Sequence, residues 1–165
     1  SEPETQALNR FFESKRDSIT MAVSLHSYGR SILHPYSCQS LGMKLNSTFL
    51  SLFQFAVEDL LQNIHAKYTT GQAWATPGLY SVNGDAVDYL FSHFAIPSFS
   101  VEVGFLSSKT QLPPSYPQLS EMRGFWPSME PFLEECNQLL LNALRTSGCN
   151  LQLGRRFLKV GVRGC

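Results

Sequence analysis

The order of apolar and polar positions divides the chain into amphipathic stretches and short apolar runs. The amphipathic stretches predict helices over residues 1–16, 47–68, 85–94 and 124–147. The second of these carries one apolar face at steps of three and four residues, formed by Leu50, Phe53, Val57, Leu60, Leu61 and Ile64.

Two short apolar runs, residues 18–25 and 97–104, predict strands. Both runs are mostly apolar, a pattern typical of central strands that are covered on both faces of a parallel sheet. Helices and strands follow one another along the chain, so the order of elements predicts an α/β domain with a largely parallel sheet. The Gly-, Pro- and Asn-rich stretch 69–85 predicts a long irregular loop, and loops of that length are often functional.

Composition narrows the class of protein. The chain has 165 residues, of which 43% are hydrophobic and 16% are charged, and this suits one globular domain. Lys plus Arg and Asp plus Glu both number 13, so the net charge is zero, and we expect neither a nucleic-acid partner nor binding to a membrane surface. No stretch is apolar for long enough to span a bilayer.

The two ends of the chain differ in character from its middle. The chain begins SEPET without a starting Met, and we therefore expect it to be part of a longer protein. Residues 150–165 contain four basic residues and no acidic one, so we expect a domain over residues 1–145 and a basic C-terminal tail over residues 146–165.

Two further sequence features bear on the cellular compartment. The four cysteines form no C-x-x-C pair, which argues against zinc-knuckle and thioredoxin-like sites and leaves free thiols and disulfides both open. The NST triplet that begins at Asn46 is an acceptor sequence for N-glycosylation if the protein is secreted.

One reactive side chain lies near the end of each predicted strand. His26 follows the apolar run 19–25, and Glu102 lies between Val101 and Val103 near the end of the second strand. A carboxylate in such a strand is costly to bury unless it is paired or used. Sites in open α/β sheets form beyond the carboxyl ends of the strands, so we expect His26 and Glu102 on one rim, within roughly 10 Å, the scale of a metal site with its base. The residues alone leave open that His26 is an ordinary loop histidine.

Longer motifs around these residues resemble a known family. The segments SEPET-x-A-x-x-x-F-x-x-S-K, HSYG-x-x-I-L-x-PY, LYSVNGDAVDYLF and FSVEVG occur in this order over roughly residues 1–140. Together they resemble the zinc metallocarboxypeptidases of the carboxypeptidase A/B type, the peptidase M14 family. Tyr80 lies 22 residues before Glu102, which is also the interval in that family.

The resemblance implies a fold and a set of roles. The fold would be part of a mixed, largely parallel sheet with helices on both faces, and residues 1–145 would be the C-terminal half of the catalytic domain. His26 would be a ligand of Zn²⁺, and Glu102 would take a proton from the zinc-bound water and pass it to the leaving amine. Tyr80 would close over the terminal carboxylate of the substrate, while Ser27 and Tyr28 would contact the peptide before the cleaved bond.

The resemblance also implies the class of substrate. Val87 occupies the position that resembles the selectivity residue of the family, which favours removal of apolar C-terminal residues from peptides and proteins. Asp85 lies two residues away and could also face the substrate pocket, and Asp88 matches an Asp that we expect to be structural. By the same resemblance we expect a secreted or extracellular protein.

Two departures from the family lead to an alternative. The H-x-x-E motif with the other two zinc ligands is absent, so we expect those ligands in a missing N-terminal half and no activity from this chain alone. After Glu102 the family reads R-D-T-G-x-Y-G-F, whereas this chain reads VGFLSSKTQLPP. The alternative hypothesis is therefore a non-catalytic, carboxypeptidase-like module for binding or regulation.

Overall fold

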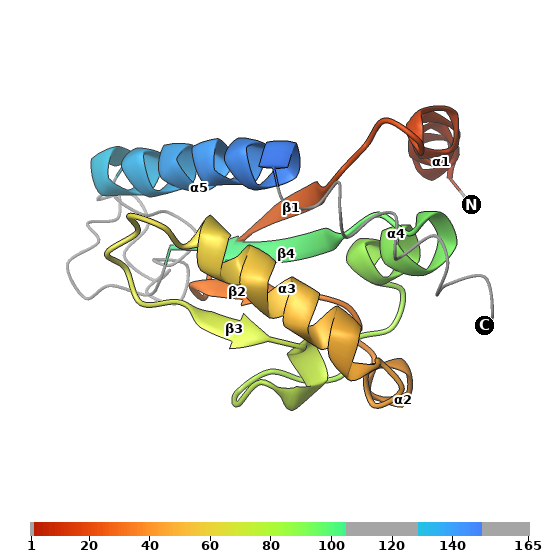
Figure 1. The fold of residues 1–165 in the computed structure, drawn as a ribbon, viewed down its shortest axis with the longest axis horizontal. Helices are drawn as coiled ribbons and strands as arrows, with labels where there is room; N and C mark the ends of the chain where they lie inside the picture. Colours follow the sequence, from red (N-terminus) through yellow and green to blue (C-terminus); the bar gives the residue numbers. More distant parts are fainter. Residues whose placement is uncertain (1, 105–128, 150–165) are drawn as a thin grey trace, which may run out of the picture.

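Four strands form one mixed sheet at the centre of the computed structural model, which describes residues 2–104 and 129–149 (Figure 1). The strands are β1 (Ala22–Ser27), β2 (Ser31–Leu33), β3 (Thr69–Gly71) and β4 (Ser98–Val103). They lie in the order β1-β4-β2-β3. The pairs β1–β4 and β2–β3 are parallel, while β2 and β4 are antiparallel, which confirms the predicted α/β class.

Two of the helices follow a residue whose side chain accepts a hydrogen bond from a free backbone N–H group. Asn46 caps one of them by accepting a hydrogen bond from the Phe49 N–H at 3.0 Å, and Asp85 caps another by accepting from the Val87 N–H at 3.1 Å. The helices are α1 (Pro3–Lys15), α2 (Gln39–Gly42), α3 (Ser47–Leu60), the short 3₁₀ helix η1 (Ala73–Ala75), α4 (Ala86–Phe94) and α5 (Met129–Cys149).

The helix predicted over residues 47–68 ends eight residues early, at Leu60. Asn63 has a positive φ of 60°, a conformation that breaks a helix, and the chain turns there. Leu61 and Ile64 still pack against the core from this turn. The apolar pattern therefore continues beyond the helix because burial continues, although the backbone has changed direction.

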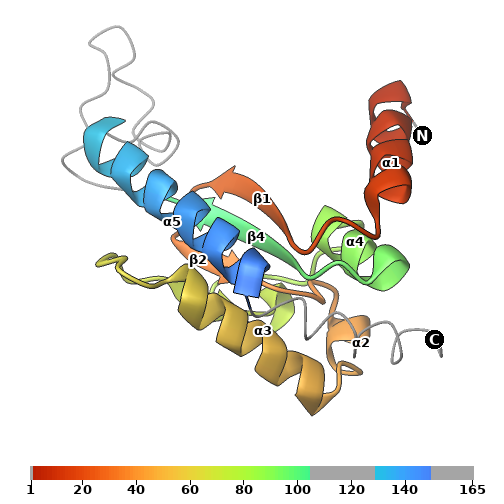
Figure 2. The same cartoon turned by 45° about the horizontal axis from the view of Figure 1, so that its top comes forward.

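The core lies between the sheet and the pair α3 and α5, which cover the same face (Figures 1 and 2). Alternate residues of β4 point into it, so Phe99 meets Phe53 of α3 with ring centroids 5.6 Å apart. Helices α1 and α4 lie beyond the end of the sheet at which β1 and β4 begin. A second, smaller apolar cluster forms there, where Leu90 and Phe94 of α4 pack against Phe12 and Ile19.

The prediction of two central strands is confirmed for β4, whereas for β1 it stays a prediction, because β1 lies at the edge of the part of the sheet that the structure describes. β4 is buried and lies between β1 and β2. β1 is an edge strand within the described part of the sheet, and Leu25 on it is 45% exposed. It starts at Ala22, later than predicted, because Ile19, the first apolar residue of the run, packs in the second cluster before the strand begins. It also extends further than predicted and includes His26.

The predicted boundary between domain and tail at residues 145 and 146 falls inside α5, which continues to Cys149. Residues 150–165 lie outside the described residues, so the basic tail stays a prediction. Cys38 and Cys136, whose pairing the sequence left open, are free cysteines.

His34 gives the fold a predicted dependence on pH. Its ring is 4% exposed and stacks on Phe53 at 4.9 Å, and burial lowers the pKa of His34. The unfolded chain therefore binds a proton at this position at a higher pH than the folded chain does. Stability should be greatest above the ordinary histidine pKa of about 6.5 and should fall as pH decreases below it, by at most about 1.4 kcal/mol per pH unit from this group.

Urea unfolding of wild type and of His34→Phe at pH 8 and pH 5.5 measures this effect. Phe keeps the stacked ring without a titrating group, and Gln72 Nε2 still donates to the Pro35 carbonyl that His34 Nδ1 contacts. We expect the loss of stability at pH 5.5 to be smaller in the variant. Equal losses in both proteins would show that His34 does not contribute.

Candidate active site

The face of the sheet opposite α3 and α5 carries the polar side chains. Val101 and Val103 of β4 point into the core, so Ser100 and Glu102 point to the other face. His26 is the register partner of Glu102 in the parallel pair of β1 and β4. The predicted juxtaposition of His26 and Glu102 is thereby confirmed, although His26 lies within its strand and not after it.

His26 is an exposed ring held by its own strand. Ser24 lies two residues earlier on the same face, and its Oγ is 2.8 Å from His26 Nε2. This contact engages one ring nitrogen, so Nδ1 is the nitrogen that remains to bind another partner. Ser24 was missed at the sequence level, although the two-residue period of a strand was a signal that could have found it.

Glu102 is a partly buried carboxyl group beside this histidine. Burial raises the pKa of Glu102, and the nearby His26 acts in the opposite direction. Among residues 2–104 and 133–146, no side chain or backbone group donates a hydrogen bond to its carboxylate. A carboxylate that is more basic than usual suits a group that must accept a proton.

Ser27 is the last residue of β1, and Tyr28 follows it in the turn between β1 and β2, which packs against the end of β4. Its Gly29 N–H donates to the Gly104 carbonyl at 3.1 Å. Arg30, the last residue of the turn, donates from Nη2 to Glu135 Oε2 of α5 at 2.8 Å.

Tyr68 completes this link between the turn and α5. Its hydroxyl also donates to Glu135, and burial together with this carboxylate raises the pKa of Tyr68. The three residues are far apart in the sequence and carry no motif, so sequence reasoning could not find them. They fix the turn that holds Tyr28 and directly follows Ser27, two of the predicted substrate contacts.

Among the described residues, Tyr80 forms no hydrogen bond or ring contact with His26 or Glu102. It is 74% exposed on the loop between η1 and α4, and no described residue forms a hydrogen bond or ring contact with it. The structure therefore shows Tyr80 on an exposed loop, as the sequence predicts, and its role stays a prediction.

Val87 and Asp85 lie at the start of α4, where hydrogen bonds hold the preceding loop. Val87 is only 1% exposed. Both carboxylate oxygens of Asp85 are engaged, because Oδ1 caps the helix and Oδ2 accepts from Ser37 Oγ at 2.6 Å. Asp88 accepts from the Ser37 and Cys38 N–H groups, and burial raises its pKa, in line with a structural role.

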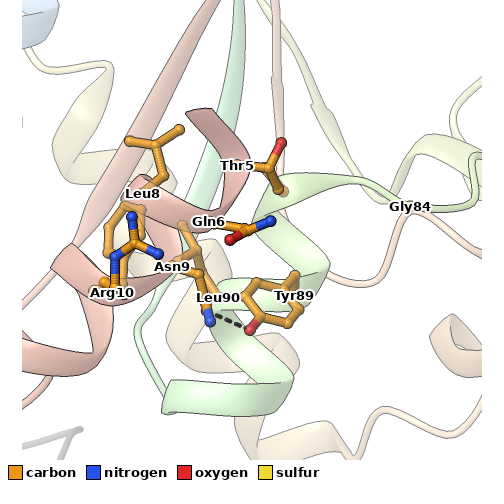
Figure 3. A pocket seen from close by; sticks show the side chains of 10 residues that line it. Thr5, Gln6, Leu8, Asn9, Arg10, Gly84, Tyr89 and Leu90 are labelled. Carbon is orange, nitrogen blue, oxygen red and sulfur yellow. Dashed lines mark hydrogen bonds between the residues drawn. The ribbon is translucent and has the colours of Figure 1, made fainter. Parts of the chain in front are cut away.

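A cavity of about 600 Å³ lies elsewhere, between α1 and the start of α4 (Figure 3). Leu8 and Arg10 of α1 line it together with Tyr89, whose hydroxyl donates to Asn9 Oδ1 at 2.6 Å. None of the predicted site residues lines this cavity. It is therefore separate from the polar face that carries His26 and Glu102.

A zinc ion would find a partial set of ligands here. The residues that the structure describes contain no group of three or more His, Cys, Asp or Glu side chains that could hold a metal. His26 offers one ring nitrogen, whereas catalytic zinc needs three protein ligands.

Within the residues that the structure describes, no helix combines the length and the apolar character that crossing a membrane requires.

Comparison with known proteins assigns the family. The family model described as zinc carboxypeptidase matches residues 1–140, most of the chain. The chain belongs to the zinc carboxypeptidase family. Among its relatives, carboxypeptidase B of Canis lupus familiaris is 30% identical over 121 residues, which are 70% of this chain and 29% of that protein. Human carboxypeptidase O is 30% identical over 128 residues, 73% of this chain and 33% of that protein.

Solved carboxypeptidase structures share the fold. Bovine thrombin-activatable fibrinolysis inhibitor, in complex with tick carboxypeptidase inhibitor, has a TM-score of 0.63 at 22% identity and is matched over 89% of this chain and 46% of that one. Carboxypeptidase A from Helicoverpa armigera has a TM-score of 0.57 at 20% identity, over 91% of this chain and 35% of that one. The chain thus spans about a third of the length of the curated family members that it matches.

Proposed function

We propose that the protein to which this chain belongs is a zinc-dependent exopeptidase that removes the C-terminal residue from peptides and proteins. The observation that carries the proposal is the pairing of His26 with Glu102 on the polar face of the sheet, in a chain of the zinc carboxypeptidase family. A histidine and a carboxylate on neighbouring strands supply one metal ligand and one proton acceptor side by side.

His26 is the residue of this chain that would hold zinc. Its Nε2 is engaged by Ser24, which fits the general rule that a metal-binding histidine uses its second nitrogen for a hydrogen bond. The other two ligands would lie outside the described residues. When bound, zinc supplies a Lewis acid that polarises the scissile carbonyl and makes water a stronger nucleophile.

Glu102 would act as the general base and acid. Its carboxylate would accept a proton from the attacking water and pass that proton to the leaving amine. The raised pKa of Glu102 supports this role, because a more basic carboxylate holds the proton long enough to deliver it.

Substrate recognition would come from the turn after β1 and from the loop before α4. Ser27 and Tyr28 would contact the peptide before the cleaved bond, and Tyr80 would close over the terminal carboxylate. Val87 would favour an apolar C-terminal side chain. Asp85 would contribute less to selectivity, since both of its oxygens already accept hydrogen bonds within the protein.

We also propose that the protein is secreted or extracellular and that its partners are the C-termini of peptides and proteins. Recovery of the full-length protein from the culture medium, and not from the cell pellet, would test the first point. Retention of the expressed full-length protein inside the cells would contradict it.

The preference for apolar residues is tested with Val87→Asp in the full-length protein. A carboxylate at this buried position rewards a cationic side chain and penalises an apolar one. We expect the ratio of kcat/KM for peptides ending in Phe or Leu over those ending in Lys or Arg to fall by roughly 10- to 100-fold, since an unpaired buried polar group costs about 1–3 kcal/mol.

Val87→Asn is the matched control, because it has the shape and polarity of Asp without the charge. It should weaken cleavage of apolar substrates without creating a preference for Lys or Arg. If wild type already prefers Lys or Arg, Asp85 supplies the charge of the pocket and the role given to Val87 is wrong.

A further inference from the structure

The hydroxyl of Ser31 is buried without a hydrogen-bond partner. Ser31 begins β2 and is 4% exposed, and its Oγ contacts no donor or acceptor in the part of the chain that the structure describes. Leaving a buried hydroxyl unpaired costs free energy, and most such groups in folded proteins are satisfied. The position of Ser31 suggests which group it serves.

Ser31 is the register partner of Glu102 in the antiparallel pair of β2 and β4. Directly opposed residues share a face of the sheet, with Cβ atoms about 5 Å apart. The next residue, Ile32, points into the core, so Ser31 points to the polar face together with Glu102. His26 and Ser31 thus flank Glu102 from the two neighbouring strands.

Gly29 leaves space beside both side chains. A Cβ atom on Gly29 would lie 3.5 Å from Glu102 Cβ, 3.9 Å from Glu102 Cγ and 3.9 Å from Ser31 Oγ. The Glu102 side chain and the Ser31 hydroxyl therefore both lie beside Gly29, which has no side chain to separate them. Within the described residues, the Ser31 hydroxyl has no hydrogen-bond acceptor and the neighbouring Glu102 carboxylate has no hydrogen-bond donor.

We propose that Ser31 is a positioning residue for Glu102, and that its hydroxyl donates a hydrogen bond to the carboxylate, directly or through one water in the space beside Gly29. The proposal rests on the proposed function, in which Glu102 is the base. A glutamate side chain has several rotatable bonds, and a bond from Ser31 to one oxygen would hold the other oxygen toward the reacting water.

The test compares Ser31→Ala with Ser98→Ala in the full-length, zinc-loaded protein. Ser98 lies on the same face of β4, but its hydroxyl already donates to the Ile96 carbonyl at 2.8 Å and it is four residues from Glu102. Ser31→Ala should lower kcat by roughly 10- to 100-fold with little change in KM, because a misplacement of a reacting group by about 1 Å can cost about 100-fold in rate. Its urea midpoint should fall no further than that of Ser98→Ala, which also loses one hydrogen bond.

Ser98→Ala should leave kcat unchanged, although it lowers the urea midpoint by removing the hydrogen bond to the Ile96 carbonyl. Ser31→Thr keeps the hydroxyl and should retain most of the wild-type kcat. An unchanged kcat in Ser31→Ala would overturn the proposal, as would equal losses of kcat in Ser31→Ala and Ser98→Ala.

A second measurement does not depend on activity. Urea midpoints of the full-length protein as wild type, Ser31→Ala, Glu102→Ala and the double variant form a double-mutant cycle. Non-additive midpoints are expected if the two side chains interact, and additive midpoints would contradict the contact. If no variant turns over any peptide, the proposed exopeptidase function fails, while non-additive midpoints would still support the contact between Ser31 and Glu102.

Discussion

Replacement of Glu102 by Gln in the full-length, zinc-loaded protein is expected to lower kcat by about 100- to 10,000-fold, the usual contribution of a general acid–base group. The amide keeps the shape of the carboxylate but cannot accept the proton, so the loss falls on the chemical step. Zinc content by atomic absorption and the affinity for a product or inhibitor should stay close to wild type.

Folding should not suffer from this substitution. Burial raises the pKa of Glu102, which means that the site disfavours the charged carboxylate, and a neutral amide avoids that cost. The urea midpoint of Glu102→Gln should therefore equal or exceed that of wild type.

Glu58→Gln is the matched control for Glu102→Gln, because Glu58 is exposed on α3, away from the polar face of the sheet. It should leave kcat unchanged. Retention of more than half of the wild-type rate by Glu102→Gln would rule out the base. If wild type itself cleaves no peptide with zinc present, the non-catalytic binding module becomes the better account.

Glu135→Ala is expected to lower the free energy of unfolding by about 2–3 kcal/mol, the range for hydrogen bonds that involve charged groups. Glu135 accepts from Arg30 Nη2 at 2.8 Å and from the Tyr68 hydroxyl, and its side chain is 9% exposed. Both donors lose this acceptor in the variant. Urea unfolding followed by circular dichroism measures the change.

The adjacent Glu134 provides the control for Glu135→Ala, because it lies on the same helix with its side chain exposed. Glu134→Ala should change the free energy of unfolding by no more than about 0.5 kcal/mol. Similar effects of the two substitutions would show that the link between α5 and the turn after β1 contributes little to stability.

The sequence predicts the central chemistry because strand ends have a simple geometry. His26 and Glu102 each lie at the end of an apolar run, and parallel strands place such ends together, so their juxtaposition needs no knowledge of the register. The place of Ser31 opposite Glu102 could not be predicted in this way. It depends on a three-residue antiparallel strand, whose partner and register are set by tertiary contacts.

The misplaced elements have similar causes. The apolar pattern over residues 47–68 indicates which side chains are buried and not where the helix ends. Side chains remain buried through the turn at Asn63, after α3 has ended at Leu60. Residues 18–25 predict one buried strand, yet Ile19 is only partly buried and packs against the cluster that contains α4 before β1 starts. The link from Arg30 to Glu135 joins residues 105 positions apart, which no local pattern encodes.

The cap of α3 has a consequence for modification of the surface. Asn46 uses its side-chain oxygen to hold the Phe49 N–H, so its amide nitrogen, the atom to which a sugar would be joined in the NST triplet, takes no part in the cap. A glycan at Asn46 would therefore leave the start of α3 intact. That end of the helix lies away from the carboxyl ends of β1 and β4, so such a glycan would lie far from the strand ends that carry His26 and Glu102 (Figures 1 and 2).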